Sequence, residues 1–297
     1  MQISRLIKVA SASAAVVLLA AACGSGGSGG SGGSASPSHI APPSIPMATA
    51  VGAGEGQLNL IAWAGYAENG STDPKVDWVT PFEQQTGCKV NVKIGNTSDE
   101  MVTLMKTGQY DGVSASGDAT LRLIYGGDVA PVNTSLVPNY ATISDFLKNK
   151  QWNSVGGQMY GIPHGWGANV LAYNTDVVKP APTSWGAVFD ASSPYSGKIT
   201  AYDSPIYIAD AALYLMKTKP DLAITNPYAL DDKQFQAAVD LLKVQRPLIG
   251  QYWAAYTDQV KGFDAGSMVL GTAWQINVNL IQADAKVKVD SIVPSEG

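Results

Sequence analysis

The sequence predicts an α/β protein of two lobes, in which each lobe has a mostly parallel sheet flanked by helices. Strand-like and helix-like segments alternate from residue 58 to residue 297, which is typical of such sheets. They form two series, each long enough for a domain of ordinary size. The chain shows no repeat of solenoid length. We therefore expect one lobe over residues 58–168 and a second over residues 169–292.

The first 57 residues differ in composition from the rest. Arg5 and Lys8 precede an apolar run over residues 9–22 that is too short to span a membrane as a stable helix. Residues 1–22 are therefore predicted to be a signal peptide. The segment "LAAAC" resembles the lipobox of bacterial lipoproteins, although Leu19 lies one place further upstream than usual. The resemblance implies lipidation at Cys23; an ordinary secretory signal is the alternative.

Residues 23–57 are predicted to form a flexible tether. Gly/Ser repeats behave as flexible coil, and the prolines that follow favour extended segments. A tether behind a lipidated cysteine would hold a domain away from a membrane. We expect an exported protein, lipid-anchored at the outer face of the cytoplasmic membrane, in the periplasm or on the cell surface.

The first lobe begins with the apolar run "LNLI" and continues in a β-α-β-α order. "CKVNVKI" alternates as a half-exposed strand does, and Cys88 at its start is predicted to be a buried free thiol. Thr97 and Glu100 have the spacing of a capping box at the start of a helix. A short strand, a loop of small residues and a helix over residues 118–126 follow.

The second lobe repeats the alternation. "YGIPHGWGANVLAYN" and "KITAYDSP" have strand character, and "DAALYLMKT" and "FQAAVDLLKV" have helical periodicity. Asp231 and Asp232 precede the second of these helices, where they favour capping and the helix dipole. "SMVLGTAW", "INVNLIQADA" and "VKVDSIV" predict a strand, a helix and a strand.

Charge and cysteine content exclude several classes of protein. The net charge is −5 and only 14% of residues are charged, without the basic patch that nucleic-acid binding requires. A mildly acidic surface favours cationic ligands. Cys23 and Cys88 are the only cysteines, which leaves no disulfide framework and no CxxC motif.

Catalytic motifs are absent from the sequence. There is no Walker A, HExxH, EF-hand or GxSxG motif, since "GVSASG" has Ser116 where the last requires glycine. His39 lies in the tether, so a histidine-dependent hydrolase or zinc site would rest on His164. We expect no enzyme, no cofactor and no metal; a secreted surface hydrolase using His164 or a carboxylate pair is kept as an alternative.

Several segments resemble the extracellular solute-binding proteins of ABC importers, in the spermidine/putrescine-binding branch. The resemblance is carried by "YGIPHGWGANVLAYNTDVV", "PTSWGAVFDASSPYSGKITAYDSP", "VKVDSIVPSEG" and "FEQQTGCKVNV", and it extends from Leu58 to Gly297. It implies a type II periplasmic-binding-protein-like fold whose two lobes close on a ligand. It also implies that residues 293–297 begin a return crossover. On that basis we expect a C-terminally truncated member with an incomplete first lobe and exposed apolar surface.

The resemblance also implies a set of ligand contacts. Polyamine binders hold methylene chains and ammonium groups against aromatic walls and fix the charged ends with carboxylates. Trp63, Tyr66 and Trp274 match wall aromatics, and Ser116 matches a loop serine. Asp118 stands where the family has an aromatic, so it is either a carboxylate contact or a helix N-cap.

The second lobe departs from the family pattern. In "YDSPIY" the places of two acidic contacts hold Ser204 and Tyr207, and Asp203 is the adjacent substitute carboxylate. Trp166 and Tyr202 are further candidates. Loss of both acids argues for fewer ammonium groups on the ligand, or for a neutral stacked ligand.

Together these observations predict a lipid-anchored, monomeric, non-enzymatic receptor that delivers a small cationic solute such as putrescine or spermidine to an ABC permease. The alternatives are a binder of a sugar-like or single-amine solute, the secreted hydrolase, and an inert truncated product. In this interpretation Trp63 and Tyr66 form one wall of a cleft; by themselves they would more often belong to a core.

Overall fold

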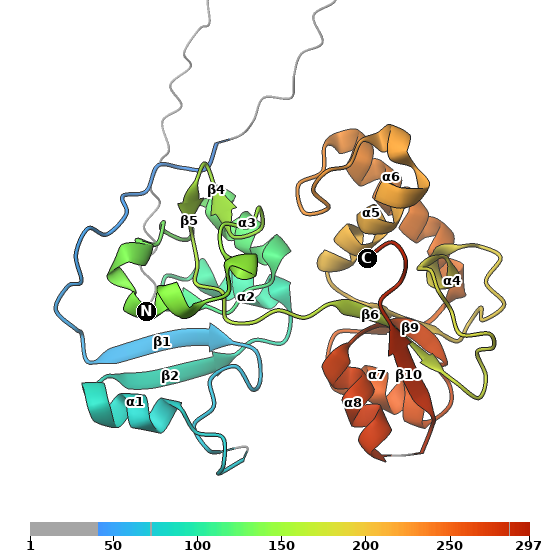
Figure 1. Ribbon diagram of the computed structural model, residues 1–297, viewed down its shortest axis with the longest axis horizontal. Coiled ribbons are helices and arrows are strands. Elements are labelled where there is room, and N and C mark those ends of the chain that lie inside the picture. Colours follow the sequence, from blue (N-terminus) through green and yellow to red (C-terminus); the bar gives the residue numbers. More distant parts are fainter. Residues whose placement is uncertain (1–40, 72, 285) are drawn as a thin grey trace, which may run out of the picture. The chain divides into compact units, whose positions relative to one another are not determined.

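The computed structural model describes residues 41–71, 73–284 and 286–297 (Figure 1). Residues 39–297 form one compact unit. The predicted signal peptide, Cys23 and most of the tether lie outside the described residues. Within residues 39–297 there are sheets of three, five and two strands.

The first sheet is parallel throughout, with the strand order β2-β1-β3. Its strands alternate with three helices in the order that the sequence predicts. Thr97 caps the second helix by accepting a hydrogen bond from the Glu100 backbone N–H, and the Glu100 carboxylate accepts from the N–H of Asn96. The elements are β1 (Gln57–Ala62), α1 (Val79–Thr86), β2 (Lys89–Ile94), α2 (Ser98–Met105), β3 (Gly112–Val113) and α3 (Gly117–Gly126).

The two faces of the first sheet are covered unequally. Helices α2 and α3 pack on one face, where Ile61 and Met101 are fully buried. On β2, an edge strand with α1 beside it (Figure 1), Val92 and Ile94 are 36% and 41% exposed. Apolar surface is thus exposed on this lobe, as expected. Cys88 is half-buried, so the prediction of a buried thiol was wrong; the residue sits just before this edge strand.

A connecting region leads from α3 to the second sheet. It contains a hairpin of β4 (Ser154–Val155) and β5 (Gln158–Met159). The Val132 N–H donates to the carbonyl of Met159 and joins this hairpin to the preceding segment. The region also contains three 3-10 turns, at Thr134–Leu136, Pro138–Thr142 and Asp145–Leu147.

The second sheet has the order β10-β6-β9-β7-β8. The pairing directions show that β7, β8, β9 and β10 run the same way and that β6 alone is reversed. Strand β6 enters from an extended loop, without the crossover helix that a parallel neighbour requires. The strands are β6 (Asn169–Asn174), β7 (Ile199–Tyr202), β8 (Ile249–Trp253), β9 (Leu270–Trp274) and β10 (Val289–Ile292).

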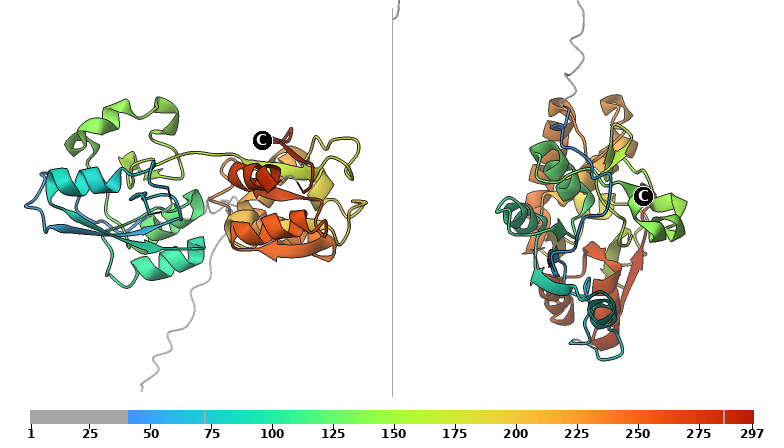
Figure 2. Two further views of the ribbon diagram at one scale, coloured as in Figure 1. Left: turned by 90° about the horizontal axis from the view of Figure 1, so that it is seen from below. Right: turned by 90° about the vertical axis from the view of Figure 1, so that its left-hand side faces the viewer.

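Helices cover both faces of the second sheet (Figures 1 and 2). One face packs against α4 (Gly186–Phe189), α5 (Ile206–Thr218) and α6 (Asp232–Gln245). The other packs against α7 (Tyr256–Asp264) and α8 (Gln275–Asp284). Short 3-10 turns occur at Pro220–Leu222 and Arg246–Leu248. Asp231 caps α6 in a reciprocal capping box with Gln234, which confirms the predicted helix start.

A buried polar network fixes the strands of this sheet against its helices. The fully buried Gln259 amide donates to Thr200 Oγ1 at 2.7 Å and to the Thr272 carbonyl at 2.8 Å. Asn277 Nδ2 donates to Gln259 Oε1 at 2.6 Å. Since buried polar groups need partners, this network holds α7 and α8 in one arrangement against β7 and β9.

The last residues of the chain pack on the second lobe. The indole Nε1 of Trp185 donates to the Gly297 carbonyl at 2.9 Å, and the Trp185 backbone N–H donates to the Glu296 carboxylate. In the described part of the chain, the helices are all too short or too polar to cross a membrane.

Replacing Gly271 with alanine should destabilise the second lobe. A Cβ at Gly271 would lie 2.4 Å from the Thr200 carbonyl oxygen, so β9 would have to move away from β7. Overpacking of this kind costs about 1–3 kcal/mol. Urea denaturation of Gly271→Ala should show a lowered midpoint. Gly161→Ala is the control, because nothing lies within 4 Å of its Cβ. Equal midpoints for the two variants would contradict the expected clash.

Candidate ligand-binding site

A cavity of about 1730 Å³ lies where β1 of the first lobe ends and β6 of the second lobe begins. It is lined by the loop after β1, the loop after β3, the extended segment before β6, the end of β9 and one side of α5. Loops at the carboxyl ends of parallel strands are the usual place for ligands in α/β folds. The cavity is roomier than typical pockets for small molecules, which hold roughly 300–1,000 Å³.

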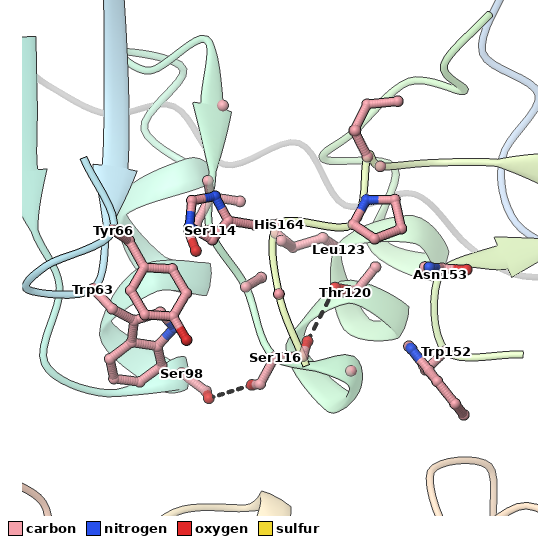
Figure 3. Close-up of a pocket in the computed structure, with 18 of the residues that line it drawn as sticks. Trp63, Tyr66, Ser98, Ser114, Ser116, Thr120, Leu123, Trp152, Asn153 and His164 are labelled. Atoms are coloured by element: carbon pink, nitrogen blue, oxygen red, sulfur yellow. Dashed lines mark hydrogen bonds between the residues drawn. The ribbon is translucent and has the colours of Figure 1, made fainter. Parts of the chain in front are cut away.

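Trp63 and Tyr66 lie together on the first-lobe side of this cavity (Figure 3). The chain turns between them at Gly65, whose φ is +82°, and the Tyr66 N–H donates to the Trp63 carbonyl. Tyr66 is 41% exposed and stacks on His164, with 4.7 Å between ring centroids. Both rings are therefore presented at the cavity, at the place the sequence predicted for an aromatic wall.

Trp274 at the end of β9 supplies an aromatic surface from the second lobe. Its ring packs edge-on against Trp63 at 6.0 Å, and against Tyr202 and Trp253 at 5.1 Å each. Burial raises the pKa of Tyr202 to about 12, so this phenol is neutral at physiological pH and keeps its proton to donate. Tyr202 and Trp274 both line the cavity.

The loop after β3 ends in a chain of hydroxyl groups. Ser116 Oγ donates to Asp118 Oδ1 at 2.7 Å, and Ser98 Oγ lies 2.7 Å from Ser116 Oγ (Figure 3). Because the Ser116 proton is used on the carboxylate, Ser98 is the donor to Ser116. Ser116 holds the N-cap position of α3, so the interpretation of Asp118 as the N-cap was wrong. Asp118 lies in the first turn, where the helix dipole favours a carboxylate.

In the described part of the chain, the second oxygen of Asp118 has no hydrogen-bond partner. Asp118 Oδ2 is shielded from solvent and makes no hydrogen bond. Burial raises the pKa of this carboxyl above its usual value, and the Ser116 hydrogen bond, the Ala119 backbone N–H and the Arg122 charge offset that effect only in part. Asp118 does not itself line the cavity, but Ser116, to which it is bonded, does.

Asp210 is a cavity residue that the sequence reasoning missed. It projects from α5, and its Oδ1 accepts a hydrogen bond of 2.9 Å from Asn169 Nδ2. Its Oδ2 is shielded and without a partner, although the residue as a whole is half-buried. Burial raises the pKa of Asp210 to about 7; the Asn169 hydrogen bond opposes this shift and the charge on Asp118 adds to it. The signal in the sequence was a lone acid within the apolar helix "IYIADAALYLM".

Tyr228 and Trp152 complete the part of the cavity near these carboxyls. Their rings meet edge-on at 6.3 Å. Burial raises the pKa of Tyr228 to about 12, and the charges on Asp210 and Asp118 contribute to the shift. Two carboxyls from different lobes therefore lie near one neutral phenol.

Three predicted contacts of the second lobe lie away from the cavity. Asp203 is exposed and borders a separate shallow pocket with Arg246. Ser204 Oγ is shielded without a partner. Tyr207 is buried in the core, and its hydroxyl accepts from Gln245 Nε2 at 2.7 Å. Their roles as ligand contacts stay predictions.

Trp166 and His164 lie on the extended segment before β6. Trp166 lines the cavity and is 64% exposed. His164 contacts the Tyr66 ring, with no carboxylate bonded to it among the residues described. In that same part of the chain, no group of three or more His, Cys, Asp or Glu side chains is arranged to hold a metal ion.

Comparison with known proteins gives consistent matches. A family model described as bacterial extracellular solute-binding protein matches residues 77–297. The chain is 24% identical over 256 residues to a putrescine/cadaverine-binding protein of Pseudomonas aeruginosa, covering 81% of this chain and 66% of that one. It is also 24% identical over 254 residues to the spermidine/putrescine-binding periplasmic protein of Escherichia coli, covering 82% and 69%.

A solved structure shows the fold. The spermidine/putrescine ABC transporter substrate-binding protein of Streptococcus pneumoniae matches with a TM-score of 0.57 and 20% identity, covering 81% of this chain and 68% of that one. The predicted two-lobed, type II periplasmic-binding-protein-like fold is confirmed. The chain spans about two thirds of the length of the relatives it matches.

The raised pKa of Asp210 predicts how stability depends on pH. A carboxyl whose pKa is about 7 in the fold and 3.8 as a model group contributes stability that is present below pH 4 and lost as the pH rises through 7. Asp210→Asn removes this loss, so the variant should be more stable than the parent at pH 8, by on the order of 1–4 kcal/mol. The two should converge near pH 4.

Thermal denaturation from pH 4 to pH 8 measures this difference. Asp203→Asn is the matched control, because it removes an exposed carboxylate from the same lobe. A gap between Asp210→Asn and the parent that stays constant across the pH range would show that no buried charge is being relieved.

Proposed function

The chain belongs to the family of bacterial extracellular solute-binding proteins, and on that premise we propose that it captures a small cationic solute in the cavity and delivers it to the permease of an ABC importer. Members of this family are substrate-binding components of transport and not enzymes, which confirms the expectation of a non-enzymatic protein. Membership of this family argues against a hydrolase centred on His164.

The charge of the cavity lining carries this proposal. Among the residues described, its lining contains no lysine and no arginine. The carboxylate residues of the lining are Glu68, Asp111, Asp128 and Asp210, and Asp118 stands directly behind Ser116. A cavity lined by one sign of charge concentrates the opposite charge, so it selects cations over anions.

The aromatic side chains support an organic cation over an inorganic one. Trp63, Tyr66 and Trp274 offer ring faces and edges to the cavity. Each cation–π contact contributes about 0.5–2 kcal/mol, and the rings also cover methylene groups. The names of the relatives point in the same direction, so putrescine or spermidine is the proposed solute class. A sugar-like solute would use the aromatic rings and leave the carboxylates unpaired.

The cellular setting is part of the proposal. Cys23 and the predicted signal peptide lie outside the described residues, and they support export and lipid anchoring at the outer face of the cytoplasmic membrane. A monomer that closes on its solute would present both lobes to the permease, and contacts from both lobes would favour the closed form.

Titration calorimetry with putrescine and spermidine tests the proposal. We expect saturable binding of at least one polyamine by the purified full chain. 1,4-Butanediol is the control ligand, because it has the length of putrescine without its charges. Equal binding of the diol and the diamine, or binding of neither polyamine, would overturn the cationic assignment.

Removing a wall ring should weaken polyamine binding. Trp63→Ala and Trp274→Ala should each reduce affinity about 2- to 30-fold, corresponding to one cation–π contact. Trp78→Ala is the matched control, since Trp78 is 51% exposed and does not line the cavity. Calorimetry on the three variants measures the effect. If Trp78→Ala weakens binding as much as the other two, the wall assignment fails.

A further inference from the structure

We propose that Asp210, oriented by Asn169, is the second-lobe carboxylate that binds an alkylammonium group of the solute, with Asp118 as its counterpart on the first lobe. This inference rests on the proposed function and names the residues that would recognise the cation. The positions at which the family resemblance places acidic contacts hold Ser204 and Tyr207, and neither lines the cavity.

The Asp210 carboxylate is held at the cavity by Asn169. Asn169 is the first residue of β6 and pairs in register with Trp274 on β9. Its Nδ2 donates to Asp210 Oδ1, so the carboxylate is fixed beside the strand that carries a wall aromatic. An ammonium bound at Asp210 would therefore lie close to an aromatic surface, which is the environment that stabilises organic cations.

The free oxygen of Asp210 has no hydrogen-bond partner among the residues that the structure describes. Oδ1 is used by Asn169, and Oδ2 is shielded without a hydrogen bond. None of the salt bridges among the described residues involves Asp210 or Asp118; Arg122, the cation near Asp118, pairs with Asp99. Unpaired buried carboxylate oxygens are costly, and an ammonium group supplies both the charge and up to three donors.

The arrangement of Asp118 mirrors that of Asp210. Its Oδ1 accepts from Ser116, and its Oδ2 is likewise shielded and unpartnered. The two carboxyls are near enough for the charge on Asp118 to disfavour ionisation of Asp210. A cation placed by them would relieve this repulsion and give both free oxygens a partner. Because both oxygens are covered in this structure, binding requires the side chains packed over them to part.

Asp210→Asn is the deciding variant. It keeps the size of the side chain and an acceptor oxygen for Asn169, and it replaces the charged free oxygen with a neutral NH2 group. Loss of one partner of a buried charge pair predicts a fall in putrescine affinity of about 30-fold or more. Asp221→Asn, which removes an exposed second-lobe carboxylate that does not line the cavity, should change affinity less than about 2-fold. Calorimetry with putrescine and with n-butylamine, together with a circular dichroism check of folding, gives the readout.

The outcomes separate this inference from the proposed function. If the parent chain binds putrescine and Asp210→Asn binds it as well as the parent does, Asp210 does not bind the cation, while the proposed function stands. If the parent binds neither amine, both proposals fail. A loss with Asp210→Asn and Asp118→Asn, but not with Asp221→Asn, supports the assigned pair. An equal loss with Asp221→Asn would show a general charge effect and overturn it.

Discussion

The antiparallel pairing of β6 with β9 is the constraint on which the second-lobe half of the site depends. It sets Asn169 opposite Trp274 at one end of the sheet, so a hydrogen-bonding amide and an aromatic ring reach the cavity from neighbouring strands. A slip of β6 by one residue would turn Asn169 to the other face of the sheet, away from Trp274. The buried amide of Gln259 fixes β9, the strand that carries Trp274, because its two hydrogen bonds join β7 to β9.

The electrostatics of the cavity depend on the groups that surround Asp118 and Asp210. Asp118 and Asp210 each have one oxygen fixed by a neutral donor and one oxygen without a partner. Tyr202 and Tyr228 stay neutral, since burial raises the pKa of each to about 12. Among the residues described, the cavity lining therefore offers carboxyl groups and aromatic surface without a lysine or arginine to neutralise the carboxyls.

Much of the fold could be predicted from local patterns, and the site could be predicted only in part. Alternating strands and helices, the helix starts at Thr97 and Asp231, and the aromatic pair after β1 all lie in short segments that carry their own signals. Asp210 could not be placed in this way, because its role depends on Asn169, which is 41 residues away and meets it only in the folded sheet. Asp203 was predicted as a contact because the segment "YDSPIY" resembles a family segment that carries acidic contacts. In the structure Asp203 lies at the turn into α5, where it is exposed and away from the cavity.

Burying Asp210 in α5 lowers the stability of the folded protein, and this destabilisation bears on the role of the residue. An acid in an otherwise apolar helix loses hydration and gains a single neutral hydrogen bond, and a neutral side chain there would be easier to bury. Strongly shifted carboxyls that lie in a cavity beside a second charge are characteristic of functional sites. A bound cationic solute would offset this destabilisation, because it pairs the free oxygens of both acids at once. The instability of the unpaired carboxyls thus becomes a source of binding energy, and it acts only on ligands that carry the complementary charge.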